Sequence, residues 1–338
     1  MNCAPSSPDN PPVSAVVSHS VLHPDFIAAE VARRYDLPGP VDAFLLYRGM
    51  NDVYLIKDAA GTHYALRSWR KTWRDVDSVG YELSFLDFLR SKGFPASVPV
   101  AQKDGCLWFK TAAPEGDRAI ALYDWAPGSK FGECLSEDTA HRIGAHFADM
   151  HRLGQEWIGT GHQYSAAQAK EYSVWMPALI DFVYDRPDDI RDYTIIAERL
   201  AEKLDQLVAD GLPMGVCHRD FHPSNVHVDE DGRITLLDFD ALGEDFLMQD
   251  VKNYTWGNLF YNFSPAYGEA FEAGYASVRP FTAAEIDNQQ LFLMAKAFRL
   301  VSGMADSSRS VGRGTLRFRN LDWLGDYIKT RARLTGLL

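Results

Sequence analysis

The arrangement of hydrophobic and polar residues changes along the chain from strand-like to helical. A helix at residues 25–35 is followed by short apolar runs that turn residues separate, which is the pattern of an antiparallel sheet. An amphipathic helix at 75–93 lies between these runs, with Asp77 or Ser78 as its cap and Gly93 as its end. The strand-like runs occupy residues 43–49, 52–58, 62–69, 97–101, 106–112 and 119–128.

Beyond residue 126 the apolar residues recur mainly at helical spacing. Helices are predicted at 136–154, at 197–211 and from 250 onward. Ser136 is a suitable N-cap for the first of them. Residues 214–242 interrupt the helices with two short strands joined by a turn at 229–232.

These patterns predict an α+β protein of two lobes. We expect a flexible tail rich in Pro and Ser at residues 1–20, a small antiparallel-sheet lobe at 21–125 and a larger, mainly helical lobe at 126–338.

Composition excludes some classes of function. The chain is 46% hydrophobic and 24% charged, as in a soluble globular protein. Acidic residues outnumber basic ones, 46 against 34, which argues against nucleic-acid binding and is compatible with a cationic ligand, although such charge commonly serves only solubility. No apolar run approaches the roughly 20 residues that span a bilayer. We therefore expect no membrane contact.

The N-terminus and the cysteines indicate a cytoplasmic protein. Residues 1–20 lack the basic start and apolar stretch of a signal peptide. The four cysteines, none in a C-x-x-C pair or at zinc-ligand spacing, are typical of reduced thiols.

The interrupting segment carries the residues suited to chemistry. Residues 218–225 read HRDFHPSN, and residues 236–240 read LLDFD after the two short strands. The Asp220 carboxylate can accept a proton from an attacking hydroxyl. The oxygens of Asn225 and Asp238 suit magnesium, a cation that prefers oxygen ligands. Phosphoryl transfer requires positioning, charge neutralisation and a group that orients the nucleophile, and these residues supply all three.

These motifs resemble those of a known enzyme family. HRDFHPSN fits the H-x-D-x-x-x-x-N catalytic loop of kinases. Its His-Pro-x-Asn ending and the Asp240 that replaces the glycine of D-F-G resemble the aminoglycoside phosphotransferase and homoserine kinase family, which includes choline-kinase-like enzymes. The stretches at 65–70, 81–100 and 121–128 are also similar to that family, so the resemblance covers roughly residues 25 to 330.

The resemblance implies a protein-kinase-like fold and a role for each matching residue. Residues 21–125 would form the nucleotide-binding lobe, and residues 126–338 would carry the catalytic loop and the acceptor site. Asp220 matches the catalytic base, and Asn225 and Asp238 match the magnesium ligands. The family binds ATP and Mg²⁺.

Other matching positions lie in the first lobe. Arg67 falls where the family has a phosphate-binding Lys or Arg, and Glu82 matches its ion-pair partner. The turn with Gly49, Asn51 and Asp52 matches the loop that covers the nucleotide, although it lacks the full G-x-G-x-x-G. Backbone near Tyr123, Asp124 and Trp125 would meet adenine. The alternatives are a solvent-facing Arg67 and a solvated Glu82.

Several residues have two interpretations. His218 is expected to support the loop, whereas His222 either packs against the loop or approaches the acceptor hydroxyl. We expect a site role for Asp240. The histidines 141, 146 and 151 are five residues apart, a spacing that does not place them on one helical face, so ordinary helix positions are expected. Aromatic residues at 256–263 either pack in the core or wall the acceptor pocket.

The leading hypothesis is an ATP-dependent phosphotransferase that acts on a hydroxyl of a small molecule, such as an aminoglycoside-type antibiotic, an amino alcohol, homoserine or a sugar. A protein kinase of the bacterial stress-response type and a nucleotide-sensing pseudokinase are the alternatives. A narrow acidic pocket behind Asp220 would favour a small-molecule acceptor, and an open groove would favour a protein. The sequence does not indicate the oligomeric state.

Overall fold

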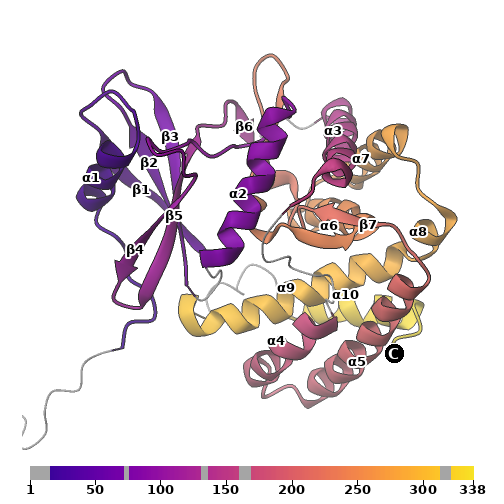
Figure 1. Ribbon diagram of the computed structural model, residues 1–338. Coiled ribbons are helices and arrows are strands. Elements are labelled where there is room, and N and C mark those ends of the chain that lie inside the picture. Colours follow the sequence, from indigo (N-terminus) through magenta and orange to yellow (C-terminus); the bar gives the residue numbers. More distant parts are fainter. Residues whose placement is uncertain (1–15, 72–75, 131–135, 160–168, 313–320) are drawn as a thin grey trace, which may run out of the picture.

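The chain forms two lobes that lie side by side (Figure 1), as predicted. The computed structural model describes residues 16–71, 76–130, 136–159, 169–312 and 321–338. The smaller lobe, here the N-lobe, is built on a twisted five-stranded sheet, and the larger C-lobe is mainly helical.

The N-lobe sheet is antiparallel throughout, in the order β1-β2-β3-β5-β4. Its strands are β1 (Asp42–Arg48), β2 (Asn51–Lys57), β3 (His63–Trp69), β4 (Phe109–Ala113) and β5 (Gly116–Asp124). Helix α1 (Pro24–Arg34) buries Ile27 and Val31 against one face of the sheet. Helix α2 (Val76–Ser91) buries its apolar residues in the main core, which continues into the C-lobe.

Two details of the N-lobe differ from the sequence predictions. Residues 97–101 form no strand; Pro99 makes only an isolated bridge to Tyr123, because a proline has no N–H for a continuous ladder. Asp77 and Ser78 lie inside α2, which already includes Val76, so neither is its cap. The predicted end of the helix is confirmed, since Gly93 adopts a φ of 69° and its N–H donates to the Arg90 carbonyl.

A buried ion pair fixes the N-lobe from within. Asp52 and Arg118 are fully buried, and Nη2 of Arg118 lies 2.8 Å from Oδ2 of Asp52. His19 is 3.0 Å from the same carboxylate, and Ser20 donates its N–H and hydroxyl to Glu115. The prediction of a flexible tail up to residue 20 is therefore wrong for these two residues, because buried acceptors hold them.

The C-lobe packs its helices around one apolar core. Its helices are α3 (Glu137–Glu156), α4 (Ala169–Phe182), α5 (Pro187–Ala209), α6 (Leu247–Phe260), α7 (Pro265–Val278), α8 (Ala283–Asp287), α9 (Gln289–Val311) and α10 (Leu321–Leu334). Ser136 caps α3 as predicted, accepting from the Thr139 N–H. Helices α3 and α7 cross closely at Gly144 and Gly274, where a Cβ would lie less than 2 Å from a facing carbonyl oxygen.

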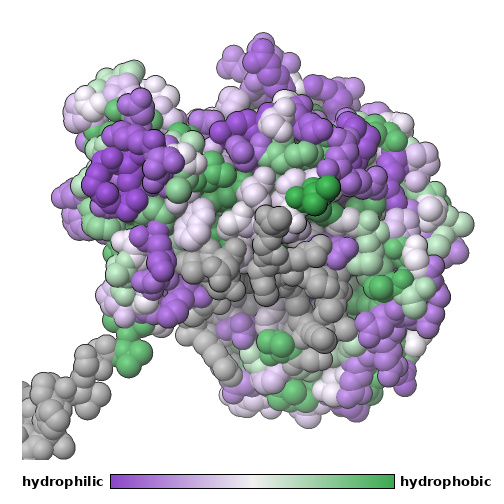
Figure 2. All heavy atoms as spheres, viewed as in Figure 1, coloured by the Kyte–Doolittle hydropathy of each residue, from purple (hydrophilic) through white to green (hydrophobic). Residues whose placement is uncertain are grey.

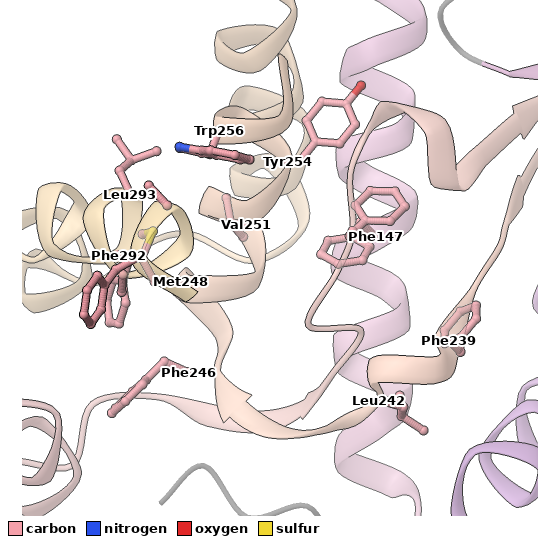
Figure 3. Close-up of a cluster of buried hydrophobic side chains, with 14 of the residues drawn as sticks. Phe147, Phe239, Leu242, Phe246, Met248, Val251, Tyr254, Trp256, Phe292 and Leu293 are labelled. Atoms are coloured by element: carbon pink, nitrogen blue, oxygen red, sulfur yellow. The ribbon is translucent and has the colours of Figure 1, made fainter. Parts of the chain in front are cut away.

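Short strands position the catalytic segment on this core. They are β6 (Ser129–Lys130), β7 (Met214–Cys217), β8 (Val226–Val228), β9 (Ile234–Leu236) and β10 (Gly243–Phe246), paired as β6-β8-β9 and β10-β7. The predicted hairpin between β8 and β9 is confirmed, and Gly232 supplies its positive φ. Figure 3 shows the apolar side chains beneath, from α3, α6 and α9 and from residues 239–246.

Within the described ranges, no helix is long and apolar enough to cross a bilayer. On the face shown in Figure 2, hydrophilic residues cover much of the outer surface of both lobes, and hydrophobic ones form small separate patches.

Candidate active site

The predicted catalytic loop, residues 218–225, follows β7 and is held by one buried carboxylate of α6. The Asp250 carboxylate accepts the N–H groups of His218 at 2.6 Å and Arg219 at 2.7 Å. Arg219 has a φ of 65°, an uncommon value for a residue other than glycine. The side chain of Asn253 donates to the Arg219 carbonyl at 3.0 Å. These contacts compensate for the backbone strain and fix the direction of the next residue, Asp220.

Asp220 faces a lysine from a distant part of the chain. Nζ of Lys296, on α9, lies 2.7 Å from Oδ1 of Asp220. Burial alone would raise the pKa of the Asp220 carboxyl, but Lys296 and His222 outweigh burial and lower it to about 2. Asp220 is therefore ionised near neutral pH, as a proton acceptor requires.

His222 supports the loop and also lies near Asp220. Its Nδ1 accepts the Ser224 N–H at 3.2 Å, and its Nε2 is 3.9 Å from Oδ2 of Asp220. Burial lowers the pKa of His222 to about 4, although the Asp220 charge opposes this shift. The imidazole is therefore neutral near pH 7.

Asn225 and His218 connect the catalytic loop to the segment that follows β9. The Asn225 side-chain N–H donates to the Asp220 carbonyl at 2.9 Å, which orients the amide. His218 Nε2 lies 2.7 Å from the Leu237 carbonyl oxygen, and the Leu237 N–H donates to the Asn225 carbonyl. His218 thus has the supporting position expected for it.

The segment with Asp238 is attached to the N-lobe. Asp238 adopts a φ of 63°, and its Oδ1 lies 2.7 Å from Nη2 of Arg67 on β3. The Asn51 side chain donates to Oδ2 of Asp240 at 2.8 Å. Two N-lobe side chains thus hold the carboxylates of the LLDFD motif.

Arg67 forms the centre of a charge cluster between the lobes. Its Nη1 lies 3.3 Å from Oε1 of Glu82 on α2, and the same oxygen is 3.4 Å from the Tyr123 hydroxyl. Glu82 is buried, so the alternative of a solvated charge is wrong. Burial would lower the pKa of Arg67, but Asp238, Tyr123 and Glu82 together raise it above its usual value.

The β1–β2 hairpin extends over this cluster. The Gly49 N–H donates to the Asn51 carbonyl, and the Gly49 carbonyl accepts from Arg70. Successive side chains of a strand point to opposite faces. Asn51 therefore reaches Asp240 in the cleft, whereas Asp52, although it belongs to the same turn, points to the buried Arg118.

Two cavities lie between the lobes. The larger, about 290 Å³, is lined by Asp220, Asp238 and Asp240 and by residues of α9 that include Lys296 and Arg299. The smaller, about 60 Å³, lies beside Arg67, Glu82 and Tyr123. Trp125 is 43% exposed, and it is not one of the described residues that line the two cavities.

Sequence reasoning missed the residues that α4 and α9 bring to the larger cavity. Trp175 comes from α4, and Lys296 and Arg299 come from α9. One signal was present: Lys296 is the single charged residue in the apolar run 291–298, and a buried lysine requires a partner. Asp250, the anchor of the catalytic loop, was taken only as the start of a helix, which in fact begins at Leu247.

A second group of titratable residues lies behind the loop. His151, Cys217 and Asp250 are buried together, with ligand atoms within 4.8 Å of one another. His151 already bonds Asp250 through Nε2 and the Tyr275 hydroxyl through Nδ1, and burial holds the pKa of the Cys217 thiol well above its usual value. The group is therefore an internal support of the loop. Among the aromatic residues at 256–263, Trp256 is buried and packs in the core (Figure 3).

The chain is similar to phosphotransferases in sequence and in fold. The family model described as "Phosphotransferase enzyme family" matches residues 49–285. The chain is 30% identical to an uncharacterized protein of Deinococcus radiodurans, over 88% of this chain and 86% of that one. It is 25% identical to a homoserine kinase of Azorhizobium caulinodans, over 78% of each. A solved amicoumacin kinase in complex with AMP-PNP, Ca²⁺ and Ami shares the fold, with a TM-score of 0.72 and 18% identity, over 91% of this chain and 93% of that one.

The fold and the matched segment define a kinase of small molecules. The chain belongs to the phosphotransferase enzyme family, as the motifs predicted, and is by class an ATP-dependent small-molecule kinase.

Proposed function

We propose that this enzyme transfers the γ-phosphate of ATP to a hydroxyl group of a small molecule. The acceptor oxygen forms a bond to the γ-phosphorus while the bond from that phosphorus to the β,γ-bridging oxygen breaks. ADP leaves with the bridging oxygen, and Asp220 accepts the hydroxyl proton. The observation that carries the proposal is that Asp220 and Asp238 line one cavity, with Asn225 hydrogen-bonded beside Asp220.

The donor set in the cleft fits a magnesium ion. The Asn225 amide uses its N–H on the Asp220 carbonyl, which leaves its oxygen for a cation. The Asp238 side chain is 43% exposed and so is accessible. Both offer the hard oxygen ligands that Mg²⁺ prefers. We propose that these two residues hold the ion, which would neutralise phosphate charge, and that Asp240 stands behind them.

The N-lobe residues would position the nucleotide. Arg67, oriented by Glu82, can donate two parallel hydrogen bonds to phosphate oxygens. Gly49 and Asn51 would cover the phosphates, because their hairpin borders the larger cavity. The small cavity beside Tyr123 supports an adenine site near the backbone of residues 123–125; the exposed Trp125 side chain does not line this cavity.

The cavity and the relatives favour a small-molecule acceptor over a protein. Asp220 lies in a cavity of about 290 Å³, and the named relatives act as homoserine and amicoumacin kinases. The pseudokinase alternative rested on Arg67 and on the sparse glycine turn. Arg67 is a paired cation at the centre of the cleft, which suits phosphate binding.

Asp220→Ala tests the proposal. We expect this variant to lose phosphotransfer, measured as ADP release across a set of hydroxyl compounds, while it retains Mg·ATP binding by calorimetry. Full turnover in the variant would contradict the assignment of Asp220. Labelling of a generic protein substrate with γ-³²P, without transfer to any small alcohol, would favour the protein-kinase alternative.

We also propose a cytoplasmic location. Cys106 and Cys217 are free thiols in the described part of the chain, as expected in a reducing compartment. Cys3 and Cys134 lie outside the described residues.

A further inference from the structure

Lys296 on α9 is a buried ammonium group with a single bonding partner. Its side chain is 7% exposed, and its Nζ lies 2.7 Å from Oδ1 of Asp220. Within the described part of the chain this is its one hydrogen bond and its one ion pair. An ammonium group carries three N–H donors, and buried donors in folded proteins are as a rule hydrogen-bonded. Two donors of Lys296 therefore need acceptors that the described residues do not supply.

The surroundings of Lys296 indicate where those acceptors come from. Its neighbours on α9, residues 291–295, 297 and 298, are buried and apolar, and the carbonyls of a helix interior are used within the helix. Lys296 also lines the larger cavity together with Asp220 and Asp238. In Figure 1, α9 runs across the C-lobe towards the N-lobe. The missing acceptors are therefore expected on a ligand that occupies this cavity.

The bond to Asp220 places the ammonium group beside the reacting atoms. Lys296 occupies Oδ1 of the carboxylate, whereas Oδ2 is 3.9 Å from Nε2 of His222, which is too far for a hydrogen bond. Oδ2 is thus available to the acceptor hydroxyl, which a general base contacts at about 2.6–3.2 Å. The attacked phosphorus lies about 3–3.5 Å from the attacking oxygen. The oxygens on that phosphorus therefore arrive next to Lys296.

Lys296 brings a positive charge to the proposed base. His222, two residues after Asp220, is neutral near pH 7, because burial lowers its pKa to about 4. Arg67 lies 2.7 Å from Asp238, the proposed metal ligand, just as Lys296 lies 2.7 Å from Asp220. One cation thus accompanies each of the two carboxylates between which the phosphoryl group would pass. Fixed donors at the place where charge develops are a large contribution to catalysis.

We propose that Lys296 is a further catalytic residue, which holds Asp220 with one N–H and donates another to a non-bridging oxygen of the γ-phosphoryl group. This inference rests on the proposed phosphotransfer. In the step, the acceptor oxygen bonds to the γ-phosphorus, and the bond from that phosphorus to the β,γ-bridging oxygen breaks. The hydroxyl proton passes to Oδ2 of Asp220, and ADP leaves with the bridging oxygen. Lys296 keeps its protons throughout, and only its hydrogen bonds change.

The plateau of the pH profile tests this second role of Lys296. A lysine that acted only on the charge of Asp220 would shift the acid limb of the profile and leave kcat on the plateau unchanged. A lysine that also donates to the phosphoryl group sets the plateau itself. We expect kcat on the plateau to fall at least tenfold in Lys296→Met. The assay is ADP release from Mg·ATP with water as the acceptor, so no alcohol has to be identified first. An unchanged plateau would overturn the inference.

Calorimetry with Mg·AMP-PNP shows whether the loss lies in transfer or in binding. The proposed bond strengthens as the phosphoryl group moves towards Asp220, so Lys296→Met should bind Mg·AMP-PNP within about threefold of the unmodified protein. This measurement also reports that the variant is folded. Lys203→Met, at an exposed position of α5, is the matched control and should change neither quantity. A large loss of Mg·AMP-PNP affinity with an unchanged kcat would place the contact in nucleotide binding and contradict a role in transfer.

Two further variants separate the donor from the contact with Asp220. Lys296→Arg keeps a charged donor and should have a higher plateau than Lys296→Met. Lys296→Gln can still donate to Asp220 but offers the phosphoryl group no cation, so its plateau should be at least tenfold below that of the unmodified protein. It also reports if Lys296→Met fails to fold. An unmodified rate in Lys296→Gln would contradict the proposed contact.

The unmodified protein separates this inference from the proposed function. If it releases ADP and the Met and Gln variants share its plateau, the role of Lys296 fails and the phosphotransfer proposal stands. If it neither binds Mg·AMP-PNP nor releases ADP with water or with any alcohol of the set, the phosphotransfer proposal fails, and the role of Lys296 fails with it.

Discussion

The two halves of the candidate active site are held in different ways. The loop with Asp220 is fixed inside the C-lobe, by Asp250, Asn253 and Lys296. The segment with Asp238 and Asp240 is also part of the C-lobe chain, but Arg67 and Asn51 of the N-lobe bind its carboxylates. The proposed base is thus pre-organised within one lobe, whereas the proposed metal site depends on how the two lobes meet.

Asp238→Asn should give the largest effect and should sharpen this contrast. Loss of a metal-binding carboxylate should reduce kcat by about 10³-fold or more, similar to loss of a catalytic group. Unlike Asp220→Ala, it should also weaken Mg·ATP binding. Calorimetry with ATP at several magnesium concentrations checks this. The exposed Asp231→Asn is the control, and unchanged Mg·ATP affinity in Asp238→Asn would contradict the metal assignment.

Asp250→Asn should destabilise the loop that carries the proposed base, Asp220. The substitution removes the charge that two backbone N–H groups and His151 share, and loss of one partner of a buried ionic network costs about 3 kcal/mol. We expect the free energy of unfolding to fall by this amount in urea titration, together with kcat. Asp188→Asn, at an exposed pair on α5, should change stability by less than about 0.5 kcal/mol. Equal effects in the two variants would contradict the anchoring role.

Asn51→Ala should weaken Mg·ATP binding without unfolding the protein, because it removes the hydrogen bond to Asp240. A hydrogen bond to a charged group contributes about 1.5–3 kcal/mol, so the KM for Mg·ATP should rise about tenfold. Asn51→Asp should raise it further, because it places a second carboxylate beside Asp240. Steady-state kinetics check the order. A larger defect in Asn51→Ala than in Asn51→Asp would oppose the proposed contact.

The loss of activity in Lys296→Met should be smallest at neutral pH and larger in acid. Lys296 holds the pKa of Asp220 at about 2, below its usual range, and burial would raise that pKa once the lysine is gone. The acid limb of the kcat/KM profile should therefore move to higher pH, so that activity at pH 5 falls more than at pH 8. Lys203→Met, at an exposed position, should leave the profile in place. A profile that does not move would contradict the electrostatic role of Lys296.

The sequence predicted the parts of the site that local patterns encode. The spacing of Asp220, Asn225 and Asp238 around a hairpin identified the two loops, and the resemblance to the kinase family implied the pairing of Arg67 with Glu82. These residues lie next to one another through short-range structure or through one sheet–helix contact. The two-lobed fold followed from the same change of hydrophobic period.

What remained unpredicted depends on long-range packing. Lys296 meets Asp220 across 76 residues, and no periodicity connects them. Arg299 reached the same cavity only because α9 turns that face to the cleft. The buried position of Asp52 was unpredicted for a different reason: its neighbour Asn51 reaches the cleft, and the alternation along β2 directs the next side chain to the opposite face of the sheet.

The contact between Arg67 and Asp238 implies an order of events in the cleft. An oxygen that already accepts from a guanidinium is a poorer ligand for a divalent cation, so Arg67 and a metal ion held by Asp238 would compete for one carboxylate. A free ion offers Arg67 no new partner, whereas a nucleotide brings phosphate oxygens that can draw the arginine away. We therefore expect the metal ion to enter bound to the nucleotide. When the nucleotide binds, Arg67 would exchange its hydrogen bond with Asp238 for one with a phosphate oxygen.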